Sequence, residues 1–165
     1  MKCQLTPLAL LITLLGCTDP LEDVFGNAET ISIVRDADTV QAYRVPSQYG
    51  DTGPVDIDLL DDESMLTGPV PVPDNRSTEL KELLLDQSTY GWDYAKSCEP
   101  NYGVRVQFKS NGDHVDVLFC FQCEILAVYR DGKVVGGEDF DNAHHQLVSI
   151  VKQLFPNDEL IQSLD

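Results

Sequence analysis

The chain has little positive charge and few aromatic side chains. Against 11 Lys and Arg residues stand 28 Asp and Glu residues, so the 165-residue chain carries a formal net charge of −17. A surface this acidic repels phosphate backbones, which disfavours nucleic acid as a partner, and a protein partner is expected to present a basic surface. With 42% apolar and 8% aromatic residues, the composition fits one soluble globular domain.

Common catalytic motifs are also missing from the sequence. There is no Gly-x-Ser-x-Gly, no glycine-rich phosphate loop and no His-Glu-x-x-His. A cysteine nucleophile assisted by His144 or His145 stays open, although no spacing supports it. Asp56 and Asp58 begin a calcium-loop spacing, but Leu60 and misplaced later ligands break the template. The sequence therefore favours a binding or structural role over catalysis.

Only one long apolar run is present, and it lies at the N-terminus over 5–15. It is shorter than the ~20 residues that a transmembrane helix needs, and it is typical of a signal peptide. The segment Leu14-Leu15-Gly16-Cys17 resembles the lipobox of bacterial lipoproteins. That resemblance implies cleavage before Cys17 and acylation of its side chain, so the predicted organisation is a signal peptide, 1–16, a lipidated tether, 17–25, and one domain, 26–165.

A hairpin is the clearest structural signal in the domain. Asn111-Gly112 favours a type I′ turn, which needs positive φ at both central residues. With these two residues in the turn, Ser110 faces Asp113 and paired residue numbers add up to 223. The apolar residues of both strands then fall on one face, so turn and pattern predict the same register.

Further strands extend this hairpin into a predicted meander. Alternation of apolar and polar residues continues from Cys120 to Tyr129, which predicts a long strand with a bend near Gln122. Asp131-Gly132 predicts a second tight turn, and the alternation over 39–45 predicts an earlier strand.

Helical spacing predicts the rest of the fold. A short helix is expected after Ala28, a second from Asp74 or Ser77 to near Asp86, and a last one from Asp139 or Asp141 to Phe155. Pro, Gly and Asp residues over 46–73 predict an exposed acidic loop, with a short extended piece at Val70-Pro71-Val72. The expected fold is α+β, an antiparallel meander of about three to four strands with two helices packed on one face.

Aromatic side chains gather in the loop after the second predicted helix. They are Tyr90, Trp92 and Tyr94, and Trp92 is the single tryptophan of the chain. An aromatic cluster in a loop can line a ligand site, but we expect this one to pack over the edge of the core.

The cysteines of the domain number three, which leaves at least one thiol without a partner inside it. They are Cys98, Cys120 and Cys123. In the predicted register Cys98 and Cys123 lie diagonally on one face and Cys120 on the other, which favours a Cys98–Cys123 disulfide in an exported protein.

Two more specific functions of these cysteines, zinc binding and thiol-redox chemistry, stay open. Cys98, Cys120, Cys123 and His144 could supply four zinc ligands. This requires a tight bend, because residues three apart on a regular strand face opposite ways. A thiol-redox pair is the other alternative, although nothing helical follows Cys123 as it does in thioredoxin-like sites.

The cysteine segments resemble those of small uncharacterised bacterial proteins, many of them exported. The shared pattern is Cys98-Glu99-Pro100-Asn101-Tyr102-Gly103, then Cys120-Phe121-Gln122-Cys123, then Phe140-Asp141 and Leu154-Phe155-Pro156, and it covers roughly 76–165. The resemblance carries no activity with it. We therefore expect a lipid-anchored protein of the bacterial cell envelope, with its domain in the periplasm or outside the cell.

Overall fold

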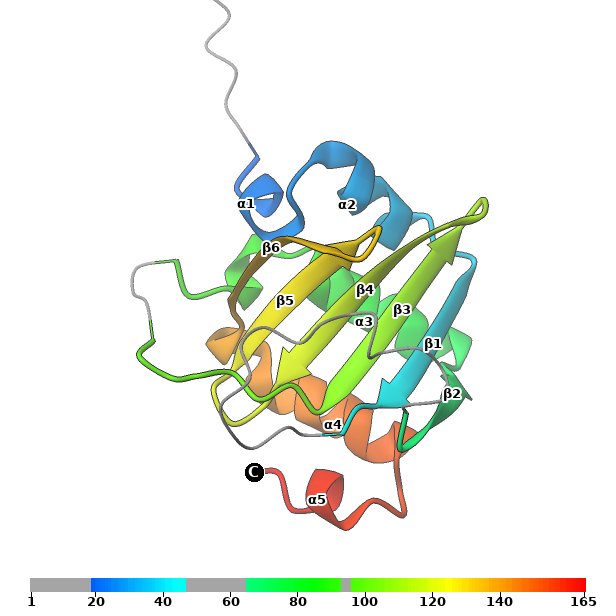
Figure 1. Ribbon diagram of the computed structural model, residues 1–165, viewed down its shortest axis with the longest axis vertical. Coiled ribbons are helices and arrows are strands. Elements are labelled where there is room, and N and C mark those ends of the chain that lie inside the picture. The colour runs from blue at the N-terminus through cyan, green and yellow to red at the C-terminus, as the bar shows by residue number, and fades with distance from the viewer. Residues whose placement is uncertain (1–18, 47–64, 93–95) are drawn as a thin grey trace, which may run out of the picture.

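The computed structural model describes residues 19–46, 65–92 and 96–165 (Figure 1). The predicted signal peptide, 1–16, and the predicted lipidation site, Cys17, lie outside these residues. So do Tyr94 and 47–64, which is most of the predicted acidic loop.

Six antiparallel strands form one sheet, in the order β2-β1-β3-β4-β5-β6. The strands are β1 (Thr39–Arg44), β2 (Thr67–Pro71), β3 (Val104–Ser110), β4 (Asp113–Cys120), β5 (Ile125–Arg130) and β6 (Lys133–Asp139). The predicted α+β class is confirmed, but the predicted three to four strands are too few. β3 to β6 form the expected meander, and β1 and β2 extend the sheet beyond β3.

The β3–β4 hairpin has the predicted register. Its pairs run from Val104 opposite Phe119 to Ser110 opposite Asp113. Asn111 has a φ of 53° and Gly112 a φ of 93°, as a turn with two left-handed residues requires. The turn chemistry and the apolar pattern thus determined the pairing together.

The predicted long strand with a bend near Gln122 is wrong. β4 ends at Cys120, four residues form a turn, and β5 starts at Ile125, which pairs with Cys120. Glu124 closes this turn with a φ of 57°. Leu126 pairs with Phe119, and paired residues of neighbouring strands share a face of the sheet. The reversal of the chain therefore shifts the predicted alternation of the two faces by one residue in β5.

β2 forms near the end of the segment predicted to be an acidic loop, where it overlaps the short extended piece predicted at 70–72. It is an edge strand that pairs with β1, and it contains Pro69 and Pro71. Proline has no N–H to donate, so these residues weaken the outer edge of the sheet as a template for another strand.

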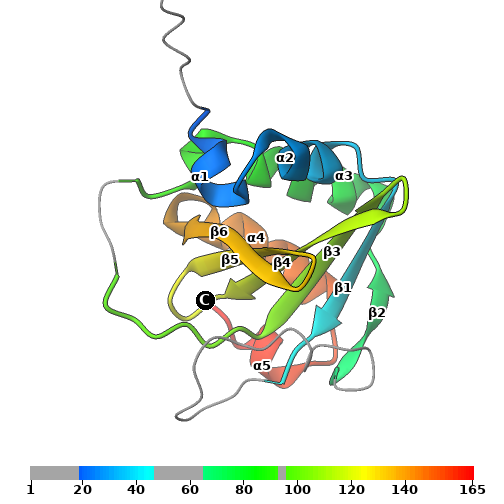
Figure 2. The same ribbon diagram turned by 45° about the horizontal axis from the view of Figure 1, so that its top comes forward.

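Helices cover one face of the sheet, as Figures 1 and 2 show from two sides. The helices there are α2 (Ala28–Arg35), α3 (Asp74–Leu84) and α4 (His144–Leu154). The shorter helices are α1 (Leu21–Phe25) and α5 (Glu159–Gln162), and two single 3-10 turns are η2 (Gln87–Thr89) and η3 (Asp141–Ala143). The prediction of two helices on one face therefore undercounts them.

Two apolar clusters lie on opposite faces of the sheet. The larger one joins the helices to alternate strand residues such as Val106, Val117 and Phe119. The smaller one lies on the other face and consists of Val45, Tyr102, Leu118, Cys120, Cys123, Ala127 and Tyr129. Because Tyr102 belongs to the smaller cluster, the segment before β3 covers one end of the sheet face opposite the helices.

The packed part of the chain begins within the segment predicted to be the tether. Leu21, Val24 and Phe25 of α1 are buried in the larger cluster. α1 packs against β6 at Gly136, where an added Cβ would lie 2.3 Å from the carbonyl oxygen of Val24. Residues of α1, which fall in the segment predicted to be the tether, are thus part of the packed structure.

Candidate functional site

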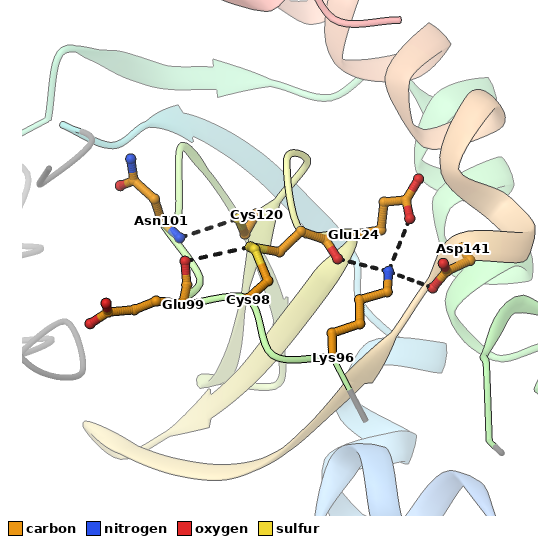
Figure 3. Close-up of a disulfide and its surroundings, with 8 residues drawn as sticks. Lys96, Cys98, Glu99, Asn101, Cys120, Glu124 and Asp141 are labelled. Atoms are coloured by element: carbon orange, nitrogen blue, oxygen red, sulfur yellow. Dashed lines mark hydrogen bonds and ion pairs between the residues drawn. A yellow bond between two sulfur atoms is a disulfide. The ribbon is translucent and has the colours of Figure 1, made fainter. Parts of the chain in front are cut away.

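A disulfide joins Cys98 to Cys123 at one end of the sheet (Figure 3). Their Cα atoms lie 5.8 Å apart. This is the pair that the sequence favours, but its setting differs from the one predicted. Cys98 lies in the loop before β3, and Cys123 lies in the turn between β4 and β5. The bond therefore pins a loop to a turn, and it does not link two strands.

The free cysteine, Cys120, is fully buried on the same side of the sheet as Cys123. The sequence predicts Cys120 on this face but Cys123 on the face of Phe119, and the reversal of the chain at 121–124 is what brings Cys123 to the face of Cys120. The backbone N–H of Asn101 donates to its Sγ at 3.2 Å. On the other side of the loop, Cys123 Sγ lies 3.5 Å from the carbonyl oxygen of Glu99, which is a contact only, because a bonded sulfur carries no hydrogen.

Lys96 is the second feature of this site, and it lies beside the disulfide (Figure 3). Its Nζ donates to the carbonyl oxygen of Cys123 at 2.8 Å, to Glu124 Oε2 at 2.9 Å and to Asp141 Oδ2 at 2.8 Å. An ammonium group has three N–H donors, so each of them has an acceptor. Lys96 thus ties the loop before β3 to the β4–β5 turn and to η3.

Protonation at this cluster follows from these contacts. Burial alone would lower the pKa of Lys96, but the hydrogen bonds and charges of Asp141 and Glu124 raise it. Burial alone would raise the pKa of Asp141, and the hydrogen bond from Lys96 leads the contacts that lower it. The pair is therefore charged at neutral pH, and Lys96 is not available as a base or a nucleophile.

Asp139, the last residue of β6, is a buried carboxylate close to this cluster. Its side chain is buried with the residue only 5% exposed, and no described group hydrogen bonds to its Oδ2. Burial raises its pKa, the positive charge of Lys96 opposes the shift, and the nearby acids Asp141, Glu138 and Glu124 add to it.

His144 joins the cluster from the start of α4. Its Nδ1 lies 3.4 Å from Glu124 Oε1, and its Nε2 lies 3.0 Å from the backbone oxygen of Asp165. Its ring stacks on Phe140 at 6.2 Å and meets Phe121 edge to face. The imidazole therefore reaches a carboxylate and two aromatic rings.

The proposed zinc ligands are not brought together as a metal centre. Cys98 and Cys123 are bonded to each other, so neither is a thiolate, and His144 reaches Glu124. Across 19–46, 65–92 and 96–165, no three His, Cys, Asp or Glu side chains are arranged to hold a metal ion. With Cys98 and Cys123 in a disulfide, the four proposed ligands do not fit zinc.

Tyr102 lies on the thiol side of the site. Burial raises its pKa to about 12, and the neighbouring Tyr129 and Cys120 add to the shift. The phenol is therefore neutral at physiological pH. It packs with both neighbours in the smaller apolar cluster.

Sequence reasoning missed most of the polar part of this site. Lys96, Glu124 and the pair Asp139 and Asp141 come from three separate segments of an acidic chain, and no spacing links these segments. A lysine beside a cysteine loop was the one available signal, because the chain has only 11 basic residues.

No family model, no curated protein and no solved structure matches the chain. The resemblance of the cysteine segments to small bacterial proteins stays a prediction. In the described part of the chain, every helix is too short or too polar to cross a membrane.

Proposed function

We propose that the chain is a lipid-anchored protein of the bacterial cell envelope, and that its domain acts as a binding or structural module. The observation that carries this proposal is Leu14-Leu15-Gly16-Cys17, which lies at the end of the apolar run over 5–15 and a few residues before α1. Only Thr18, Asp19 and Pro20 separate Cys17 from α1. An acylated Cys17 would therefore lie outside the core and next to it.

The disulfide supports export. Cys98–Cys123 persists in an oxidising compartment such as the periplasm, and such bonds are rare in reducing cytosol. Several acyl chains on one cysteine would hold the domain stably, because each buried CH₂ contributes about 0.8 kcal/mol and a single chain is marginal.

A binding or structural role is supported by how the polar groups of the site are used. The three donors of Lys96 are saturated by acceptors of the chain itself, and Tyr102 is neutral. Lys96 therefore stabilises the loop before β3, and residues 97–100 of that loop are exposed and would be the part presented to a partner.

The test is metabolic labelling with a fatty acid in a bacterial host, followed by membrane fractionation. The wild-type chain should take up label and stay with membranes, and Cys17→Ser should lose both properties. Cys3→Ser is the matched control, because Cys3 lies in the signal and should be removed with it. Equal labelling of the Cys17→Ser and wild-type chains would overturn the proposal.

A thiol-redox or metal-binding function is the alternative, and the position of Cys120 favours it. The buried thiol shares one apolar cluster with the disulfide-bonded Cys123. Reduction would release Cys98 and Cys123 and make three thiols available, with His144 as a possible fourth zinc ligand.

The alternative is tested by equilibrating the domain with glutathione buffers and with zinc. A redox or metal function predicts opening of the disulfide at cellular potentials, or one bound zinc per reduced chain. If the disulfide stays closed at these potentials, and the reduced domain takes up no zinc, the alternative is overturned and the binding or structural role stays the proposal.

A further inference from the structure

Trp92 lies next to the point where the chain leaves the domain toward Cys17. Its indole Nε1 donates to the backbone oxygen of Gln87 at 2.9 Å. The side chain of Gln87 donates from Nε2 to Asp19 Oδ1 at 3.1 Å. Two hydrogen bonds therefore connect the only tryptophan of the chain with a residue two positions from the proposed lipidation site.

The surrounding structure holds Trp92 in this place. Its ring packs edge to face on Tyr90 with 5.4 Å between centroids, and Tyr90 is buried with its hydroxyl donating to the oxygen of Leu84 at 2.6 Å. The N–H of Gly91 donates to the oxygen of Asp139 at 2.9 Å. Trp92 is nevertheless 40% exposed, so a large aromatic surface is held outward.

The anchor would bring this surface close to the bilayer. Two peptide steps separate Cys17 from Asp19, and consecutive Cα atoms lie about 3.8 Å apart, so these two Cα atoms lie within about 8 Å. Asp19 is held in turn, because its Oδ1 accepts the N–H of Leu21 at 3.0 Å at the start of α1. The covalent chain thus keeps Cys17 within a short distance of the described fold.

We propose that the surface formed by α1 and Trp92 rests on the lipid bilayer, with the Trp92 indole at the level of the head groups. Tryptophan is enriched at this level of membranes, and because Nε1 of Trp92 already donates to Gln87, the part presented to the lipid is the apolar ring. The inference rests on acylation of Cys17 and adds to it a fixed orientation of the domain. The anchor contributes the affinity, and Trp92 determines which side faces the lipid.

The orientation turns the opposite end of the molecule away from the membrane. In both views α5 lies at the far end from α1 (Figures 1 and 2). On α5, Leu160 is 67% exposed, which makes it a suitable position for a reporter. Asp19, Glu22 and Asp23 surround the start of α1, so contact is expected with zwitterionic lipid and not with anionic lipid.

The experiment uses the acylated mature protein in phosphatidylcholine vesicles that contain lipids brominated near the head group. Bromine quenches tryptophan at short range, and all tryptophan emission comes from Trp92. The wild-type protein should lose fluorescence in brominated vesicles compared with unbrominated ones. The paired variant Trp92→Phe with Leu160→Trp carries its tryptophan on α5, and it should lose none.

Two outcomes overturn the inference, and a third belongs to the proposed function. Absence of Trp92 quenching in vesicle-bound, acylated protein would contradict the orientation, and so would equal quenching of the two tryptophans. Failure of the wild-type chain to acquire a fatty acid would instead refute the anchor itself. Cosedimentation with vesicles and fatty-acid label on each sample separate these cases.

Discussion

Arg44 Nε donates to Asp158 Oδ2 at 2.6 Å and joins β1 to the first turn of α5. The Arg44 side chain is 3% exposed, and its Nη1 also donates to the backbone oxygens of Val45 and Gly103. Asp158 in turn caps α5, because its Oδ1 accepts the N–H of Ile161 at 3.0 Å. One buried cation thus fixes the C-terminal helix on the loop that follows the disulfide.

Asp158→Ala should destabilise the domain by about 2–4 kcal/mol, because it leaves Arg44 buried without its carboxylate. Burial alone would raise the pKa of Asp158, but the Ile161 N–H and Arg44 lower it. A lowered pKa gives stability that is present above the ordinary Asp value of about 3.9 and is lost as pH falls below it. Urea denaturation across acid pH checks this.

The matched control is Glu82→Ala, which removes an exposed carboxylate on α3. It should leave the free energy of unfolding within about 0.5 kcal/mol of wild type. If Asp158→Ala behaves like Glu82→Ala at neutral pH, the Arg44 contact contributes nothing measurable.

Opening the disulfide should lower the stability of the domain by about 3–4 kcal/mol, because the bond closes a loop between residues separated by 25 positions. The variant is Cys98→Ser with Cys123→Ser, measured by denaturant unfolding. Cys120→Ser keeps the bond and serves as the control for loss of a buried sulfur. A double variant that is as stable as wild type would contradict a stabilising disulfide.

Local turn chemistry explains which part of the sheet could be predicted. Asn111-Gly112 accommodates positive φ at both positions, so the β3–β4 register followed from sequence alone. The β4–β5 turn has no glycine or asparagine, and it places Glu124 in the left-handed region. Without a turn signal, the alternation was followed through 121–124 as one strand, and Cys123 was assigned to the face of Phe119 although it lies on the face of Cys120.

Long-range contacts explain what could not be predicted. Lys96 meets Glu124 and Asp141, which lie 28 and 45 residues away along the chain. α1 was assigned to the tether because 18–23 is short and polar and contains a proline, and only docking on β6 makes its five residues a stable helix. Such contacts depend on the finished fold.

Lys96→Met should cost about 2 kcal/mol at neutral pH, because it leaves Glu124 and Asp141 without their shared cation. The raised pKa of Lys96 gives stability that is complete below the ordinary Lys value of about 10.4 and is lost as pH rises through the folded value. The lowered pKa of Asp141 gives stability that is lost as pH falls below about 3.9.

The difference between Lys96→Met and wild type should therefore be largest between these two limits, which thermal unfolding across pH can measure. Lys133→Met is the control, since Lys133 is exposed at the start of β6. A difference that stays constant from acid to neutral pH would mean that lost packing, and not lost charge, explains the cost.

Gly136→Ala should release α1 from the edge of the sheet. The added Cβ would lie 2.3 Å from the oxygen of Val24 and 2.7 Å from that of Asp23, both backbone atoms, so the helix must shift. Overpacking of this kind costs about 1–3 kcal/mol. Hydrogen exchange checks it directly, because the Gly26 amide donates to the Glu22 oxygen at 2.8 Å and should exchange faster in the variant. Val134→Ala, on the exposed part of the same strand, should leave that amide protected, and equal protection in both variants would show that α1 does not depend on its contact with β6.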